Sequence, residues 1–142
     1  MILIFFGPPG AGKGTQAKKL SETLVLPHVS TGELFRDNIR DRTELGKRVE
    51  VIISRGVLVP DELTIALVRD RLRHPDCMPG TILDGFPRTP GQARALDEML
   101  DEDGNRVVLV PHIRVRDEVV LERLTDRRVD VRTGKTYHLK YN

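Results

Sequence analysis

A glycine-rich loop at residues 7–13, GPPGAGK, constrains the fold more than any other feature of this sequence. It follows an apolar run at residues 2–6, ILIFF, which is continuous rather than alternating and so is typical of a strand buried on both faces. Apolar residues at helical spacing then predict an amphipathic helix over residues 13–24. A G-x-x-x-x-G-K loop between a strand and a helix is typical of a phosphate-binding site, because glycines let backbone N–H groups point at an anion while the lysine adds a full charge.

The rest of the chain alternates short apolar runs with helical patterns. Runs at residues 81–84 and 107–110 predict two further strands. Strands separated by helices imply βαβ units, so we expect an α/β P-loop nucleoside-triphosphate-binding fold, with a parallel sheet covered by helices on both faces. Two further helices are predicted over about residues 31–42 and 44–54. A third is predicted to begin after Asp61, which can cap it, with an apolar stripe of Ile65, Val68 and Leu72. The last two are predicted around Ala93, Leu96 and Leu100, and around Val120, Leu121 and Leu124.

The end of the chain has a different pattern. Residues 133–135, Thr-Gly-Lys, separate two short alternating runs at residues 129–131 and 137–139. This arrangement predicts a β-hairpin.

Composition limits the size of the fold and the classes of partner. The 142 residues, 39% of them hydrophobic, suffice for one core. Lys plus Arg (23) exceeds Asp plus Glu (21) by only two charges and Trp is absent, so we expect no nucleic-acid partner. No apolar run approaches the roughly 18 to 20 residues that span a bilayer, so we expect no membrane insertion. The single Cys77 and four scattered His residues lack disulfide or metal-ligand spacing, and we expect a cytoplasmic location.

Two positions bear on a divalent metal. Gly14 stands where the generic loop has a Ser or Thr hydroxyl for Mg²⁺, and Thr15 comes one place later. Asp84 ends the run at residues 81–84, at the carboxyl end of a predicted strand, where ligands of such sheets bind. We therefore expect Mg²⁺ as cofactor, held by phosphates and water without a direct protein ligand, with Asp84 accepting a hydrogen bond from metal-bound water. The competing interpretation makes Asp84 a helix cap or turn former.

Six segments, the glycine loop included, carry a family resemblance: GPPGAGKGT at residues 7–15, STGELFR at 30–36, LVPDEL at 58–63, LDGFPRT at 83–89 with Gln92, LERLTDRRV at 121–129, and TGKTYHLKYN at 133–142. Together they resemble adenylate kinases, members of the nucleoside monophosphate kinase family, over the whole chain. The resemblance implies transfer of the terminal phosphoryl group of Mg-ATP to AMP, with ATP and AMP as partners. It divides the chain into a core with the P-loop (1–29 and 60–127), an AMP-binding lobe (30–59) and the start of a lid (128–142).

The resemblance also implies a role for each matching residue. Arg36 and Arg88 are expected on the AMP phosphate, and planar guanidinium groups suit that contact. Gln92 is expected to offer a donor and an acceptor to the adenine edge. The implied catalytic residues are Lys13, Arg88, Arg127 and Asp84; the implied ATP site comprises Gly10, Ala11, Gly12, Lys13, Gly14, Thr15 and Arg123; the implied AMP site comprises Thr31, Arg36, Val59, Gly85, Arg88 and Gln92.

Three alternatives stay open at this point. Pyrimidine-nucleotide kinases of similar design usually have Ala in place of Thr31, so Thr31 favours AMP, with UMP or CMP as the alternative acceptor. The family pattern continues past residue 142, so the C-terminal part of the fold and the lid are expected to be incomplete. In that case an apolar edge at residues 107–115 would favour self-association over the monomer usual for the family. The chain would also be a catalytically weak nucleotide-binding fragment rather than an active kinase. Arg36, Arg123 and Arg127, taken singly, also suit solvated surface positions.

Overall fold

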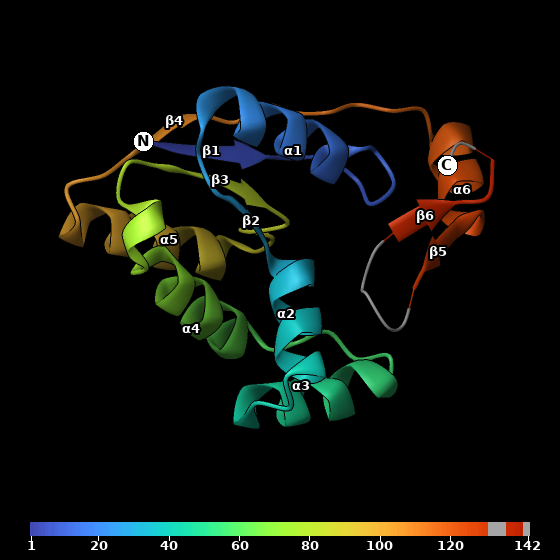
Figure 1. The fold of residues 1–142 in the computed structure, drawn as a ribbon, viewed down its shortest axis with the longest axis horizontal. Coiled ribbons are helices and arrows are strands. Elements are labelled where there is room, and N and C mark those ends of the chain that lie inside the picture. Colours follow the sequence, from blue (N-terminus) through green and yellow to red (C-terminus); the bar gives the residue numbers. More distant parts are fainter. Residues whose placement is uncertain (131–135, 141–142) are drawn as a thin grey trace.

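A computed structural model describes residues 1–130 and 136–140 of the chain. Its centre is a four-stranded sheet in the order β2-β3-β1-β4 (Figure 1). All three strand pairings are parallel, with Ile4 of β1 opposite Leu83 of β3. The prediction of a parallel α/β sheet is therefore confirmed. The strands are β1 (Ile2–Phe5), β2 (His28–Ser30), β3 (Thr81–Asp84) and β4 (Val107–Leu109).

Helices cover both faces of this sheet, as the sequence predicts. On one face, Leu3 and Phe5 of β1 pack with Ala17 of α1 (Lys13–Leu24). On the other face, Ile2 and Ile4 pack with residues of α4 (Asp61–Leu72) and α5 (Pro90–Glu102). Since successive strand side chains point to opposite faces, a strand buried on both sides has a continuous apolar run, and this explains the sequence at residues 2–5.

Several element boundaries differ from the predictions. The first strand ends at Phe5, and Phe6 makes only an isolated bridge to His112. Strand β2 was not predicted, because Val29 is the only apolar residue in its three positions. The prediction that Asp61 caps α4 is wrong: Pro60 occupies the cap position, and Asp61 is the first helical residue, with its carboxylate bonded to α5 instead.

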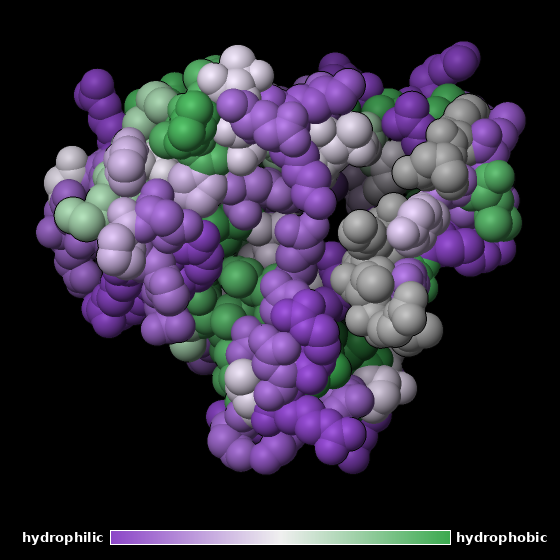
Figure 2. All heavy atoms as spheres, in the orientation of Figure 1, coloured by the Kyte–Doolittle hydropathy of each residue, from purple (hydrophilic) through white to green (hydrophobic). Residues whose placement is uncertain are grey.

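Two helices form an arm that projects from the sheet (Figure 1). They are α2 (Thr31–Arg40) and α3 (Glu44–Ser54), and Thr43 caps α3 by accepting a hydrogen bond from the Gly46 N–H at 2.9 Å. A Cβ at Gly46 would lie 2.0 Å from the carbonyl oxygen of Asn38, so the two helices approach as closely as glycine allows. Hydrophilic residues cover most of the arm, while hydrophobic residues show between the arm and the core (Figure 2).

The C-terminal part of the described chain comprises a helix and a small hairpin. Helix α6 (Asp117–Thr125) leads into β5 (Arg127–Val129), which pairs antiparallel with β6 (Thr136–His138). Strand β5 of the hairpin thus begins at Arg127, two residues before the predicted residue 129. The predicted turn at residues 133–135 lies outside the described residues. A 3₁₀ turn at Pro75–Cys77 precedes β3.

One edge of the sheet is apolar. Strand β4 pairs with β1 alone among the described strands, and Val108 and Leu109 are 45% and 56% exposed. Within the described residues, none of the helices combines the length and the apolar character needed to cross a bilayer.

Candidate active site

The glycine loop joins the carboxyl end of β1 to the start of α1. Gly10 and Gly12 have φ of 78° and 96°, in the left-handed region that favours glycine, and Gly12 is the residue that precedes the helix. No side chain among the described residues caps α1, and its first turn contains no acid. The loop therefore presents unpaired N–H groups and the positive end of a helix dipole, the two features that bind a phosphate.

Lys13 folds back across this loop. Its Nζ donates hydrogen bonds to the carbonyl oxygens of Gly7 and Pro8, both at 2.9 Å. The pKa of Lys13 lies below its ordinary value of 10.5: burial lowers it most, the Asp84 carboxylate raises it, and the guanidinium groups of Arg88 and Arg127 lower it further. Positive groups from three separate segments are thus close enough to repel one another, and a bound polyanion would relieve that repulsion.

Asp84 lies at the carboxyl end of β3, next to the start of α1. A Cβ at Gly14 would lie 3.2 Å from Asp84 Oδ2, so a Ser or Thr hydroxyl at this position would crowd the carboxylate. Asp84 is 14% exposed, and Nε2 of the 8% exposed His28 lies 3.5 Å from its Oδ2 without making a hydrogen bond. The described residues contain no cluster of three His, Cys, Asp or Glu side chains able to hold a metal. One carboxylate beside an anion-binding loop fits a Mg²⁺ that takes its other ligands from phosphates and water.

Gly85 connects the arm to the core. Its carbonyl oxygen accepts hydrogen bonds from Thr31 Oγ1 at 3.1 Å and from Arg88 Nε at 2.6 Å. Its φ is 81°, and a Cβ there would lie 2.8 Å from Arg88 Nη2 and 2.9 Å from Thr31 Oγ1. Glycine is therefore required both by the backbone conformation and by the space around it.

Gln92 is 4% exposed, and both ends of its amide are hydrogen-bonded. Nε2 donates to Asp61 Oδ1 at 2.6 Å, and Oε1 accepts from the Arg88 N–H at 2.8 Å. Asp61 Oδ2 in turn accepts from Thr89 Oγ1 at 2.6 Å. Three side chains (Asp61, Thr89 and Gln92) and the backbone N–H of Arg88 form one network between the start of α4 and the start of α5.

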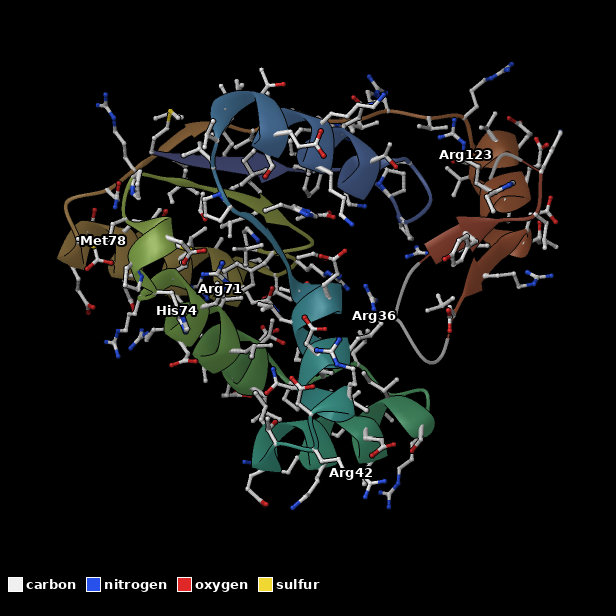
Figure 3. The ribbon with its side chains drawn as sticks, in the orientation of Figure 1. Arg36, Arg42, Arg71, His74, Met78 and Arg123 are labelled. Carbon is white, nitrogen blue, oxygen red and sulfur yellow. The ribbon has the colours of Figure 1, made fainter. Side chains whose placement is uncertain are left out.

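The three remaining arginines and Val59 come from four other parts of the chain. Arg123 of α6 donates from Nη1 to the carbonyl oxygens of Gly10 and Ala11, at 3.4 and 3.3 Å. Arg36 extends from α2 on the side that faces the β5–β6 hairpin (Figure 3), and its Nη1 would lie 3.3 Å from a Cβ at Gly32. Arg127 is the exposed first residue of β5, and Val59 is half-buried in the loop before α4.

The structure thus brings together most of the sequence-predicted residues in two groups. The glycine loop with Lys13 meets Asp84 and Arg123, while Thr31 meets Gly85, Arg88 and Gln92. Sequence reasoning missed His28 and Asp61 as neighbours of the site. A lone histidine carries no spacing signal, and Asp61 at the start of a helix suggested only a cap; its place two residues after Val59, in LVPDEL, was the available hint.

Comparison with known proteins places this arrangement in a family. The family model described as Adenylate kinase matches residues 5–140. The chain is 54% identical over its full 142 residues to an adenylate kinase of Moorella thermoacetica, and 50% identical over 139 residues, 98% of the chain, to one of Thermosipho melanesiensis; in each case it covers 65% of the relative. It is 51% identical over its full length to an adenylate kinase of Clostridium novyi, covering 66% of it. The chain therefore spans just under two thirds of the length of these curated relatives. Because the family model extends over nearly all of the sequence that forms the sheet, the arm and the glycine loop, the chain belongs to the adenylate kinase family.

Proposed function

We propose that this protein transfers the terminal phosphoryl group of ATP to AMP and so gives two molecules of ADP. The observation that carries the proposal is the position of Lys13, whose ammonium group lies at the head of the glycine loop, 2.9 Å from the carbonyl oxygens of Gly7 and Pro8 and within electrostatic reach of Asp84, Arg88 and Arg127 from distant segments. Phosphoryl transfer needs little covalent help, but it needs two polyanions held in line within positive charge. The adenylate kinase relatives support AMP over UMP or CMP as the acceptor.

The donor phosphates would bind in the glycine loop. A triphosphate would replace the carbonyl oxygens of Gly7 and Pro8 as the partner of Lys13. The N–H groups of residues 10 and 12–15 would donate to its oxygens, whereas the Ala11 N–H already donates to the Pro8 carbonyl oxygen at 3.2 Å. Arg123 already lies over Gly10 and Ala11, which supports a position beside the donor nucleotide and its adenine.

The acceptor would bind between the arm and the carboxyl end of β3. Arg36 and Arg88 would hold the AMP phosphate, while Thr31, Gly85, Gln92 and the backbone at Val59 would surround its base. We propose that residues 30–59 form the AMP-binding lobe, that 1–29 and 60–127 form the core, and that 128–142 belong to a lid whose closure keeps water from the transferred group.

In the reaction, an oxygen of the AMP phosphate forms a bond to the γ-phosphorus of ATP, while the bond between that phosphorus and the β-phosphate oxygen breaks and its electron pair leaves with ADP. Lys13, Arg88 and Arg127 would stabilise the negative charge that spreads over the equatorial oxygens. Asp84 would orient the water around a phosphate-bound Mg²⁺, which when bound supplies charge neutralisation across the β- and γ-phosphates. We place this reaction in the cytoplasm, with the monomer as the active form.

A coupled assay of ADP formation from ATP and AMP tests the proposal. Lys13→Ala is expected to lower turnover by about 100-fold or more, since it removes a charge that acts in the transition state. Lys19→Ala, on the exposed face of the same helix, is the matched control and is expected to leave turnover unchanged. Unchanged turnover in Lys13→Ala contradicts the site. Nucleotide binding without turnover in the wild type favours a nucleotide-binding fragment, and faster reaction with CMP or UMP favours a pyrimidine-nucleotide kinase.

A further inference from the structure

We propose that Asp61 sets the choice between adenine and hypoxanthine-type bases by fixing the orientation of the Gln92 amide. The inference rests on the proposed AMP site and names a specificity-determining residue that does not itself touch the base. Its basis is the network between the start of α4 and the start of α5, in which Asp61 and Gln92 lie 31 residues apart in sequence.

Two independent contacts orient the amide in the same direction. An ionised carboxylate can only accept, so the end of Gln92 that lies 2.6 Å from Asp61 Oδ1 must be the NH₂ group. A backbone N–H can only donate, so the end that lies 2.8 Å from the Arg88 N–H must be the carbonyl oxygen. The usual ambiguity of an amide side chain is therefore resolved by its partners.

Asp61 is itself held in place. Its second oxygen accepts from Thr89 Oγ1 at 2.6 Å, and the same hydroxyl oxygen accepts from the Gln92 backbone N–H at 3.1 Å. Both carboxylate oxygens are thus committed, and rotation of the carboxylate would break a contact to the first turn of α5. Gln92 is 4% exposed, so a reversed amide would set its carbonyl oxygen against Asp61 Oδ1 and its NH₂ group against the Arg88 N–H, with little water to compensate.

One donor and one acceptor remain on the amide after these contacts. The NH₂ group has a second N–H, and Oε1 has a second lone pair. Adenine presents an acceptor at N1 and a donor at its 6-amino group, which complements this pair. Hypoxanthine has nearly the same shape but presents N1–H and a 6-oxo group, so the same two contacts become donor against donor and acceptor against acceptor. An amide that cannot reverse therefore distinguishes the two bases without a steric difference.

The test compares AMP with IMP, its hypoxanthine counterpart, by equilibrium binding to the full chain. Wild type is expected to bind AMP at least about tenfold more tightly than IMP, since binding IMP leaves buried polar groups mispaired. Asp61→Asn keeps the shape but can donate as well as accept, and is expected to reduce that ratio by about tenfold. Asp97→Asn, an exposed change on α5, is the matched control and is expected to keep the wild-type ratio.

A positioning role predicts more than a loss of affinity. Asp61→Asn is expected to change the ratio through KM for the acceptor and to leave kcat with AMP within about twofold, because the Asp61 carboxylate contacts Gln92 and Thr89 and not the groups proposed to hold the transferred phosphoryl group. In a Gln92→Ala background the same substitution is expected to leave the ratio unchanged, since Asp61 acts through Gln92. Asp61→Glu, which can still only accept, is expected to retain the preference for AMP.

Three results would overturn the inference: a wild-type protein that binds IMP as well as AMP, equal losses for both nucleotides in Asp61→Asn, or a change in ratio that persists without Gln92. If Asp61→Asn does not fold, Thr89→Val, which releases Asp61 Oδ2, is expected to lower the ratio by a smaller factor, and an unchanged ratio overturns the inference. The two proposals fail separately. Absence of ADP formation in the coupled assay contradicts the proposed function, whereas an unchanged ratio of AMP to IMP affinity in the Asp61 variants contradicts only the role of Asp61.

Discussion

The Thr31 hydroxyl donates a hydrogen bond to the carbonyl oxygen of Gly85 at 3.1 Å, across 54 residues of sequence. Thr31 begins the arm, and Gly85 directly follows β3. The same carbonyl accepts from Arg88 Nε, so one backbone oxygen fixes both the base of the arm and an arginine of the proposed acceptor site. The position of Gly85 therefore couples stability to the geometry of the site.

Gly85→Ala is expected to lower the free energy of unfolding by about 2 to 4 kcal/mol and to raise KM for AMP. About 1 kcal/mol comes from placing a Cβ at a φ of 81°, and the rest from its contacts with Arg88 Nη2 and Thr31 Oγ1. Urea denaturation and steady-state kinetics measure the two effects. Gly104→Ala is the matched control, since Gly104 also has a positive φ, 63°, but a Cβ there meets nothing within 4 Å. Equal destabilisation in both variants would show that contacts at residue 85 contribute nothing.

Gly46→Ala is expected to loosen the arm. Alanine normally stabilises a helix by about 1 kcal/mol relative to glycine, but here its Cβ would lie 2.0 Å from the Asn38 carbonyl oxygen, so α2 and α3 must separate at a cost of about 2 to 4 kcal/mol. Amide hydrogen exchange is expected to accelerate in both helices while the sheet stays protected. Glu50→Ala, an exposed change on α3, is the control. Unchanged exchange in the arm would contradict the close packing.

Lys13 gives the stability a specific dependence on pH. Its pKa is lowered in the folded protein by burial, so between that lowered value and 10.5 the unfolded chain binds more protons than the folded one. The contribution of Lys13 to the free energy of unfolding is therefore constant below the lowered pKa and rises as pH increases through this window. Urea denaturation at several pH values is expected to show that the free energy of unfolding of the wild type increases relative to that of Lys13→Met as pH rises toward 10.5. The difference in the free energy of unfolding between the wild type and Lys19→Met, an exposed control on the same helix, is expected not to change over this range. The account is contradicted if the difference for Lys13→Met rises no more steeply with pH than the difference for Lys19→Met.

The apolar edge at β4 is expected to cause self-association. Unpaired strand edges with exposed apolar side chains pair with other chains, and Leu109 is 56% exposed there. Sedimentation velocity is expected to show an average mass that rises with concentration, and Leu109→Lys is expected to abolish the rise by placing charge on the edge. Leu121→Lys, at a 64% exposed position on α6, controls for added charge. If the two variants behave alike, the edge is not the site of association.

Local patterns in the sequence determined the elements and the loop. The apolar run at residues 2–5 and the helical spacing that follows it predicted β1 and α1, because a doubly buried strand and an amphipathic helix have different periods. The glycines and Lys13 predicted the anion-binding loop, since its chemistry is contained in consecutive residues. The roles of the arginines are predicted from the family motifs and stay predictions; the structure adds that Arg88 and Arg127 lie near enough to Lys13 to lower its pKa, after burial.

Contacts between distant segments were decided by the tertiary structure. Strand β2 has a single apolar residue and exists because β3 pairs with it. The sequence predicts Asp61 as a helix cap, since nothing local shows that Thr89 and Gln92 lie against its carboxylate. The sequence by itself therefore determined the fold class, the strand and helix that flank the glycine loop, and the family, because these depend on neighbours along the chain. Only the tertiary structure decided which way the Gln92 amide faces and why residue 85 must be glycine, because those depend on neighbours in space.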